Sequence, residues 1–354
     1  MPTIKTKHYS IVTGTNSLSS LKSFLSKNKF SAYFILCDEN TLLYCLPTLI
    51  FACPVLGKAE VIEIESGEES KSLEICANIW ETLTENKADK NALIINLGGG
   101  VVSDLGGFVS SVYKRGIDFI NIPTSLLAMA DASVGGKTGI DFAGLKNNIG
   151  TFAQAKSVFV DPSFLATLPE RHYMNGLAEI YKIALVADAS FWKQLQKAGP
   201  NQNAEKLVSK SISLKHAIVL KDPFDKGIRK ILNFGHSIGH AIESYFLGSE
   251  QALLHGEAVV MGMLIETHLA FQKKLLSKEH LVEIYNELSF VFDVKPLTTI
   301  NVSDLMPFIY NDKKNSKTQL LFSLIKKPGA CTFDVPVTEK QIEKALAFFN
   351  AHIQ

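Results

Sequence analysis

Three histidines and one glutamate in the second half of the chain have residue types and spacing suited to metal binding. His236 and His240 are one helical turn apart in NFGHSIGHAIE. His255 follows in LLHGEAV, and Glu179 precedes them in LAEIYK. Imidazoles and a carboxylate are good zinc ligands, and three protein ligands leave one position open for a substrate. Because small residues flank the histidines, neighbouring backbones can approach closely, and the pattern predicts a zinc site that polarises a hydroxyl or carbonyl.

A run of three glycines in the first half, Gly98, Gly99 and Gly100, follows a strand-like segment and precedes a helix-like one. Glycines let the backbone approach a pyrophosphate closely, and a helix N-terminus supplies N–H donors and a positive dipole end. The dinucleotide fingerprint expects a further glycine where Ser103 stands. The run alone leaves two interpretations open: a dinucleotide site, with Asp38 as the ribose ligand, or a tight strand-to-helix turn.

A second glycine-containing segment, VGGKT at 134–138, is similar to the end of a phosphate-binding P-loop. That motif requires a glycine five residues before Gly136, where this sequence has Asp131. No strand leads straight into the segment either. A nucleotide-kinase function is therefore disfavoured, although Lys137 is well placed to meet an anion.

Basic and amide side chains accompany the histidines in the sequence. Lys182 follows Glu179 by three residues, a spacing that also fits a simple helical salt bridge. Arginine binds carboxylate or phosphate through paired hydrogen bonds, and lysine acts as a point charge. Together, these groups suit a substrate that carries both phosphate and carboxylate: Lys182, Lys215, Arg229, Asn233, Lys313 and Lys314.

Short β-rich runs alternate with helix-like runs through the first half. AYFILC, VIEIE, ALIINL and DFINI are candidate strands, and Pro123 and Thr124 after the last run are a favourable helix opening. This alternation predicts an α/β domain with a doubly wound, Rossmann-like parallel sheet over residues 1–161. Helical spacing then predicts a mainly α-helical, metal- and substrate-binding domain over residues 162–354, with a small hairpin near QLLFSLI and CTFDV. We expect the ligand cleft between the two domains.

The composition is that of an ordinary globular protein. The chain has 354 residues, 46% hydrophobic and 20% charged, and a net charge of +1, so a nucleic-acid partner, which usually requires a basic excess, is not expected. The N-terminus lacks the apolar stretch of a signal peptide, and no apolar run approaches the roughly 18 residues that span a bilayer. No membrane partner is therefore expected. The cysteines number five and include no CxxC pair, which suits free thiols in a reducing cytoplasm.

Taken together and in this order, the segments resemble the 3-dehydroquinate synthase family, within the wider group of sugar-phosphate cyclases. The resemblance runs from about Asp38 to Lys314. It rests on these blocks: GEESK at 67–71, GGGVVSDLGGF at 98–108, KRG at 114–116, IPTSLLA at 122–128, DASVGGKTGID at 131–141, KNNIGTF at 146–152, FLATLP at 164–169, GLAEIYK at 176–182, RKILNFGHSIGHAIE at 229–243, LLHGEAV at 253–259 and NDKK at 311–314.

The resemblance implies two cofactors. A zinc ion, for which cobalt can substitute, would be held by Glu179, His236 and His255, so His240 would face substrate phosphate and not the metal. NAD would be bound by a larger set of residues: Asp38, Glu68, Lys71, Gly98, Gly99, Gly100, Val101, Val102, Ser103, Asp104, Thr124, Ser125, Lys137, Lys146, Phe164, Leu165, Ala166 and Thr167.

The resemblance also implies which residues act on a phosphorylated sugar acid. Lys215, Arg229 and Asn233 would hold its carboxylate side, and Asp131 would orient a hydroxyl. Arg115 would reach the phosphate site of a neighbouring subunit, which implies a homodimer. Lys137 belongs to the catalytic set as well as to the NAD set. The phosphate itself would meet Asn147, Lys182, His240, Lys313 and Lys314.

The implied activity converts 3-deoxy-D-arabino-heptulosonate 7-phosphate to 3-dehydroquinate and phosphate, in the shikimate pathway to aromatic amino acids. NAD would first oxidise a ring hydroxyl of the substrate, and phosphate would then be eliminated. The NADH formed would return the hydride before an intramolecular aldol closure. Three alternatives stay open. The first is a 2-deoxy-scyllo-inosose or valiolone-type synthase, whose substrate has no carboxylate. Arg229 disfavours this alternative, because an arginine suits a substrate that carries a carboxylate. An NAD-dependent metal polyol dehydrogenase would turn over NADH stoichiometrically. A non-catalytic metal- or nucleotide-binding protein would never release phosphate.

Overall fold

The computed structural model describes residues 3–5, 9–199, 203–311 and 319–353. Its contacts divide the chain into two compact units, an N-terminal unit of Met1–Tyr173 with Asn203–His216 and a C-terminal unit of Met174–Gln202 with Ala217–Gln354. Since Asn203–His216 belongs to the N-terminal unit, no single cut in the sequence separates the two. The division after residue 161 stays a prediction.

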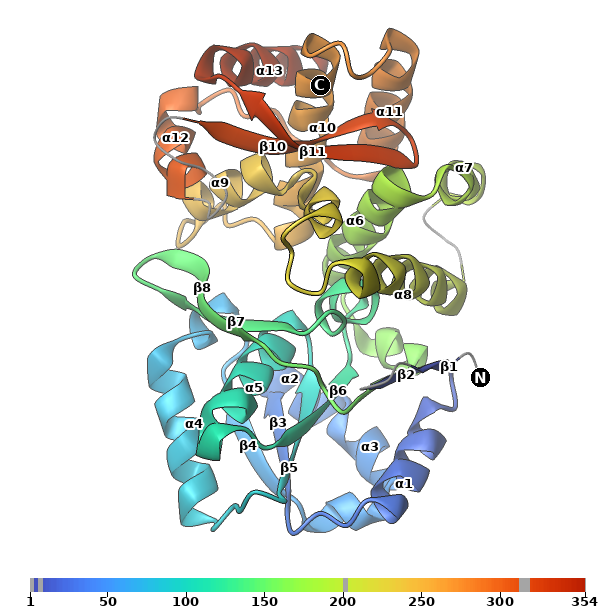
Figure 1. The fold of residues 1–354 in the computed structure, drawn as a ribbon, viewed down its shortest axis with the longest axis vertical. Coiled ribbons are helices and arrows are strands. Elements are labelled where there is room, and N and C mark those ends of the chain that lie inside the picture. Colours follow the sequence, from blue (N-terminus) through green and yellow to red (C-terminus); the bar gives the residue numbers. More distant parts are fainter. Residues whose placement is uncertain (1–2, 6–8, 200–202, 312–318, 354) are drawn as a thin grey trace. The chain divides into compact units, whose positions relative to one another are not determined.

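A seven-stranded sheet forms the centre of the N-terminal unit (Figure 1). Its neighbouring strands run parallel, except for the antiparallel edge pair β1–β2. The predicted doubly wound, parallel-rich sheet is therefore confirmed, and the runs chosen as strands are β3 to β6. In the order β1-β2-β9-β6-β5-β3-β4, the strands are β1 (Thr3–Lys5), β2 (Ser10–Thr13), β9 (Ser157–Val160), β6 (Asp118–Pro123), β5 (Leu93–Gly98), β3 (Tyr33–Asp38) and β4 (Glu60–Ile64).

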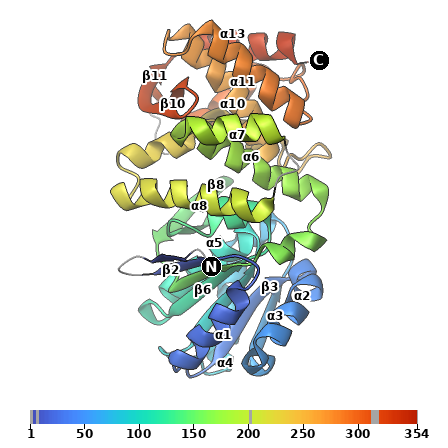
Figure 2. The same cartoon turned by 90° about the vertical axis from the view of Figure 1, so that its right-hand side faces the viewer.

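Helices cover both faces of this sheet. From β2 to β4, each successive strand is added towards the β4 edge of the sheet, and from β4 to β6 the strands are added in the opposite direction. Because the crossovers are right-handed, the helices of the first stretch and those of the second lie on opposite faces. Figure 2 shows α1 and α3 side by side in front of the strands. One group is α1 (Ser17–Lys27), α2 (Glu39–Tyr44) and α3 (Leu46–Ala52) with the 3₁₀ turn η1 (Pro54–Lys58), and the other is α4 (Leu73–Glu85) and α5 (Gly100–Val112).

A hairpin and several short turns connect the larger elements of this unit. A hairpin of β7 (Lys137–Phe142) and β8 (Leu145–Phe152), which the sequence patterns did not predict, packs on α5. The contact is close, because a Cβ on Gly107 would lie 2.4 Å from Thr138 Cγ2. The shorter turns are η2 (Glu68–Ser70), η3 (Tyr113–Arg115), the π-helical η4 (Ala128–Ala132) and η5 (Pro162–Thr167).

The C-terminal unit is mainly helical, as predicted, and α10 (His255–Gln272) is its central helix. α10 is buried along most of its length, and α9, α11 and α13 pack against it. The predicted hairpin is confirmed as the antiparallel pair β10–β11. In the stretches of chain described above, no helix has the length and apolar character needed to cross a membrane. The other elements are α6 (Glu170–Ala187), α7 (Ala189–Ala198), α8 (Ala204–Lys221), η6 (Ile228–Asn233), α9 (His236–Phe246), α11 (Lys278–Val291), α12 (Val302–Asn311), β10 (Leu320–Lys327), β11 (Ala330–Val337) and α13 (Glu339–His352).

Candidate active site

The glycine run lies at the carboxyl end of β5, where the chain turns into α5. Gly99 is the N-cap residue of α5, and no side chain caps this helix end. The backbone N–H groups of the first turn are therefore available to an anion, which the helix dipole also favours. Position 98 requires glycine, because a Cβ there would lie 2.5 Å from Val102 Cγ2. The local geometry thus suits a pyrophosphate at the start of α5.

The residues predicted to bind ribose and pyrophosphate lie at the carboxyl ends of neighbouring strands of the sheet. The strand order reverses between β3 and β5, and open α/β sheets bind ligands beyond the carboxyl ends of strands at such a point. Asp38 ends β3 there, and its Oδ1 accepts the Thr41 N–H at 2.8 Å to cap α2. Thr124 and Ser125 follow β6, and the Thr124 N–H donates to the Gly98 carbonyl at 3.0 Å.

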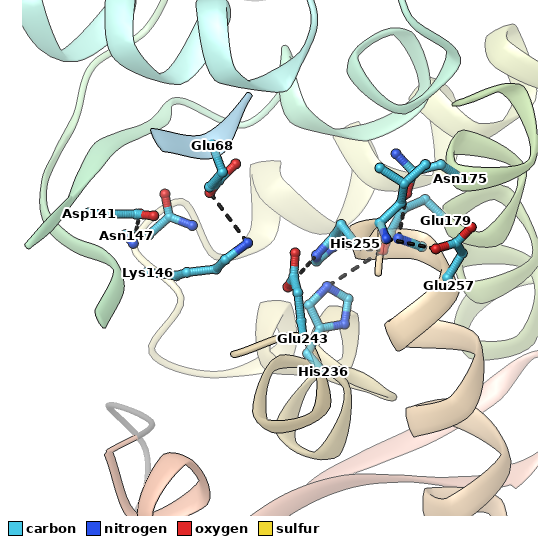
Figure 3. A network of polar contacts seen from close by, with 12 residues as sticks. Glu68, Asp141, Lys146, Asn147, Asn175, Glu179, His236, Glu243, His255 and Glu257 are labelled. Carbon is cyan, nitrogen blue, oxygen red and sulfur yellow. Dashed lines mark hydrogen bonds and ion pairs between the residues drawn. The ribbon is translucent and has the colours of Figure 1, made fainter. Parts of the chain in front are cut away.

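Lys71 is the centre of a polar network in the N-terminal unit. Its side chain is 3% exposed, and Nζ lies 3.1 Å from Asp104 Oδ2 and 2.6 Å from Asn147 Oδ1. Glu68 Oε1 lies 3.4 Å from Lys71 Nζ and 3.7 Å from Lys146 Nζ, the second of which Figure 3 draws. The structure therefore brings predicted NAD ligands of three separate segments together, and through Lys71 they contact Asn147, a predicted phosphate ligand.

Burial and neighbouring charges shift the pKa values of this network. Burial alone would lower the pKa of Lys71, but Asp104 and Glu68 outweigh burial and raise the pKa above its ordinary value. Burial raises the pKa of Asp104 and also that of Asp141, which accepts the Asn147 N–H at 2.7 Å (Figure 3). Asn147 has a φ of 49°, a left-handed conformation that asparagine tolerates better than most residues. A carboxylate thus holds the strained residue in place.

Asp131 and Lys215 form a second charged pair in the same unit. Lys215 Nζ lies 2.8 Å from Asp131 Oδ1 and donates to the Asp131 carbonyl at 2.6 Å. Asp131 lies in the π-helical η4, a rare type of turn that is frequent at functional sites. Arg229 and Asn233, which are predicted to hold the substrate carboxylate together with Lys215, belong to the C-terminal unit, and the grouping of these three residues stays a prediction.

The remaining predicted residues of the N-terminal unit lie at turns or strand ends. Arg115 is exposed at the end of η3, where Lys114 and Arg115 have φ values of 50° and 66°. Such consecutive left-handed residues are strained, and strain of this kind concentrates at functional sites. Lys137 begins β7 with an exposed side chain. The stretch 164–167 lies within η5, which buries Phe164 and leaves the last two residues exposed.

His236, His255 and Glu179 converge on one point in the C-terminal unit (Figure 3). They come from the first residue of α9, the first residue of α10 and the middle of α6. Both histidine Nε2 atoms lie 3.5 Å from the same oxygen, Glu179 Oε1. Two ligands bound at about 2.1 Å to a tetrahedral zinc ion are about 3.4 Å apart. Each histidine therefore lies at the distance from Glu179 that two ligands of one zinc ion would have.

Glycines allow the two histidine-bearing helices to approach closely. Gly235, the N-cap residue of α9, has a φ of 81°, and a Cβ there would lie 2.5 Å from Met263 Cγ on α10. A Cβ on Gly262 of α10 would lie 2.0 Å from the Gly235 carbonyl oxygen. At the start of α9, the His236 Nδ1–H donates to the Phe234 carbonyl at 3.2 Å. That tautomer leaves Nε2 available as a metal ligand.

Lys182 and His240 border this three-residue cluster. Lys182 makes a short ion pair with Glu179 Oε2, and both side chains are at most 2% exposed. The His240 ring centroid lies 5.0 Å from that of His236 and 5.6 Å from that of His255. Nitrogen atoms of the three histidines lie within 4.8 Å of one another, so a three-histidine metal site is a looser alternative to the set that contains Glu179.

The surroundings of His236 and His255 differ in charge. Burial, followed by the charge of Lys182, lowers the pKa of His236 well below its ordinary value. Burial acts in the same direction on His255, but Glu243 and Glu179 outweigh it and raise the pKa of His255 to about 10. The carboxylates around His255 therefore make this side of the cluster favourable for a cation.

Arg229 and Asn233 lie in η6, immediately before α9. Arg229 is 3% exposed, and its Nη1 donates to the Pro223 carbonyl at 2.8 Å. The Nδ2 atom of Asn233 is buried and has no hydrogen-bond acceptor among the described residues. A buried amide without an acceptor is costly, so this atom suits a ligand that supplies an oxygen. Lys313 and Lys314 lie outside the described residues.

Sequence reasoning missed two buried carboxylates beside the histidines. Glu243 Oε2 lies 3.3 Å from His255 Nδ1, and Glu266 is fully buried on α10. Glu243 follows His240 by three residues on α9, so its helical spacing was a usable signal. Glu266 had no such signal, because its partners are backbone N–H groups of another helix.

Solved structures of the same fold define the class of protein. The structure of 2-deoxy-scyllo-inosose synthase complexed with carbaglucose-6-phosphate, NAD⁺ and Co²⁺ has a TM-score of 0.86 at 22% identity, covering 98% of this chain and 99% of that chain. The 2-epi-5-epi-valiolone synthase from Streptomyces hygroscopicus subsp. jinggangensis, with NAD⁺ and Zn²⁺ bound, has a TM-score of 0.84 at 26% identity, covering 99% of each chain. The fold is that of the sugar-phosphate cyclases.

Sequence comparison identifies the family within this class. Residues 61–175 match the 3-dehydroquinate synthase N-terminal domain, and residues 176–315 match the C-terminal domain. The 3-dehydroquinate synthase of Parabacteroides distasonis is 37% identical over 336 residues, which cover 94% of this chain and 95% of the relative. The chain belongs to the 3-dehydroquinate synthase family. The predicted family and enzyme type are therefore confirmed.

Proposed function

We propose that this chain converts 3-deoxy-D-arabino-heptulosonate 7-phosphate to 3-dehydroquinate and phosphate. Family membership over nearly the whole chain supports the proposal. The observation that carries it is the pair of histidine Nε2 atoms, each 3.5 Å from the same Glu179 oxygen. The overall reaction eliminates phosphate without net oxidation, so NAD would not be consumed.

The two clusters of polar residues fit the two proposed cofactors. When bound, a zinc or cobalt ion would polarise a substrate hydroxyl, and NAD would accept and return a hydride. Glu179, His236 and His255 would hold the metal and leave a position for the substrate, because structural sites use four protein ligands and catalytic sites three. The uncapped start of α5 would bind the NAD pyrophosphate, and Asp38 at the end of β3 would bind a ribose hydroxyl.

The substrate carboxylate distinguishes this reaction from those of other cyclases. Lys215, Arg229 and Asn233 would bind it, which is supported by the buried Asn233 Nδ2 atom that lacks an acceptor among the described residues. The Asp131–Lys215 pair would orient a substrate hydroxyl. The substrate's own phosphate would take up the proton during elimination. The residues proposed to hold that phosphate are Asn147, Lys182, His240, Lys313 and Lys314.

The test is a phosphate-release assay with the purified chain, the heptulosonate phosphate and only trace NAD. We expect many turnovers per NAD molecule, complete loss of release with a chelator, and recovery on addition of Zn²⁺ or Co²⁺. A phosphorylated sugar without a carboxylate is the control substrate, and we expect little release from it. Release from that control alone would favour another cyclase activity. NADH that accumulates in proportion to substrate would indicate a dehydrogenase instead.

We also propose that the chain acts as a homodimer in which Arg115 completes the phosphate site of the neighbouring subunit. Its exposure and the left-handed backbone at Lys114 and Arg115 support this role. Arg115→Ala and Glu179→Ala would each be inactive, but a mixed dimer would contain one intact site. Random reassembly of equal amounts should restore about a quarter of the wild-type activity. No recovery with confirmed subunit exchange would refute the shared site.

A cytoplasmic location is proposed as well. All of the cysteines are free thiols, and four of them are buried, which suits a reducing compartment. Alkylation of the freshly isolated, denatured protein should modify every cysteine. Disulfides found under these conditions would argue against this location.

A further inference from the structure

Two buried carboxylates connect α9 and α10, the helices that carry the histidines, through noncovalent contacts. Neither carboxylate belongs to the proposed metal ligands or to the proposed substrate contacts. Gly235 approaches Gly262, whereas Gly239, further along α9, approaches Ala258, nearer the start of α10. The two helices are therefore antiparallel, and the N-terminus of each lies beside a later turn of the other. Each N-terminus carries one of the proposed histidine ligands.

Glu266 of α10 holds the N-terminus of α9. Its Oε2 accepts the Gly235 N–H at 2.6 Å, and its Oε1 accepts the Ile238 N–H at 3.1 Å. The side chain is fully buried, and the N-cap residue of α9 has no side-chain cap of its own. Glu266 thus supplies from another helix the acceptors that a capping residue would supply, and its negative charge meets the positive end of the helix dipole.

Glu243 makes the reciprocal contact from α9 to the start of α10. Its Oε2 lies 3.3 Å from His255 Nδ1 (Figure 3), and its side chain is 5% exposed. A carboxylate that accepts the Nδ1–H of a histidine fixes the ring orientation and leaves Nε2 for a metal. His255 Nε2 is the atom that lies 3.5 Å from Glu179 Oε1.

We propose that Glu266 and Glu243 are positioning residues that preorganise His236 and His255 for the metal before it binds. Glu266 acts on His236 through the backbone, since it fixes the residues on both sides of that histidine. Glu243 acts on His255 through the ring. The close glycine contacts leave α9 little freedom to shift along α10, so the two carboxylates and the packing specify one relative placement. This inference rests on the metal site of the proposed function.

The experiment compares Co²⁺ binding by the metal-free wild type, Glu266→Gln and Glu243→Gln, monitored by chelator competition and by the visible absorption of Co²⁺. Each substitution preserves side-chain volume but removes the charge. We expect about 10–100-fold weaker binding by either variant, with an altered Co²⁺ spectrum for Glu243→Gln. Glu283→Gln is the matched control, because Glu283 accepts the Trp192 Nε1–H at 2.8 Å on α11 of the same unit. Its affinity and spectrum should equal those of the wild type.

Hydrogen exchange tests the same inference without any substitution. In the metal-free wild type, the amides of Gly235 and Ile238 should be protected, although the first turn of a helix normally exchanges quickly. Rapid exchange of both amides would overturn the role of Glu266. Wild-type affinity and spectrum in both glutamine variants would overturn the whole inference, even if their stability fell. A wild type that binds no Co²⁺ would instead refute the metal site itself, and this inference with it.

Discussion

Glu179 is predicted to serve two separable purposes, as a metal ligand and as the counter-ion of Lys182. Their side chains are 1% and 2% exposed and form a short ion pair. Glu179→Gln removes the anion and leaves a buried ammonium without its partner, which typically costs about 3–5 kcal/mol of stability. The same change removes one of the three proposed metal ligands. We therefore expect the metal-free variant to unfold at much lower urea concentration and to bind Co²⁺ far more weakly.

A double variant separates the two effects. Glu179→Gln combined with Lys182→Met removes the unpaired charge, so most of the lost stability should return. Metal binding should not return, because the carboxylate oxygen 3.5 Å from both histidine Nε2 atoms is still missing. Urea unfolding with a chelator measures the first effect, and Co²⁺ titration measures the second. The reasoning fails if the double variant is no more stable than Glu179→Gln, or if either variant binds Co²⁺ like the wild type.

Three further predictions concern other parts of the chain. Burial lowers the pKa of His268 from 6.5 to about 4, so the unfolded chain binds more protons between these values and stability should fall as the pH drops from about 6.5 to 4, by at most about 3 kcal/mol. Urea unfolding at several pH values checks this, and a slope unchanged in His268→Gln would contradict it. Gly106→Ala should lower the free energy of unfolding by about 1–3 kcal/mol, because the new Cβ would lie 1.9 Å from Asn96 Oδ1. Gly57→Ala is the control for the same urea assay and should be nearly neutral, because the nearest atom to its Cβ would be 3.7 Å away. Lys71→Met should weaken NAD binding at least about tenfold by calorimetry, since it leaves the neighbouring carboxylates uncompensated near an anionic ligand, and unchanged affinity would remove Lys71 from the cofactor site.

Of the four strands predicted in the N-terminal unit, β3, β5 and β6 are almost completely buried, whereas β4 has alternating exposed and buried positions. β5 is buried at every position, so its apolar run was a strong signal. The β7–β8 hairpin was missed, because its strands, KTGIDF and LKNNIGTF, show no regular alternation of apolar and polar residues and few of their positions are fully buried. It is held by pairing and by packing on α5, including a 2.8 Å hydrogen bond between the Thr138 and Thr151 hydroxyls. Such contacts join residues whose proximity no local periodicity reveals.

The residue types of the candidate site could be read from the sequence, but their partners could not. Lys215 shows the difference, since it lies 84 residues after Asp131 and no sequence pattern indicated that the two side chains are in contact. The structure pairs Lys215 with Asp131, because the first part of α8 packs with the N-terminal unit. Short-range spacing is informative only within one helix or strand, and this pair joins two elements.

By itself, the sequence determined the family, the alternation of strands and helices, and the kinds of side chain available for a metal and a dinucleotide. Only the tertiary structure decided that Glu179 presents one oxygen to both His236 and His255 while the other oxygen pairs with Lys182. The physical reason is that these three side chains belong to three different helices. Their separation depends on how closely the helices pack, which follows from glycine contacts and buried carboxylates distant in the sequence.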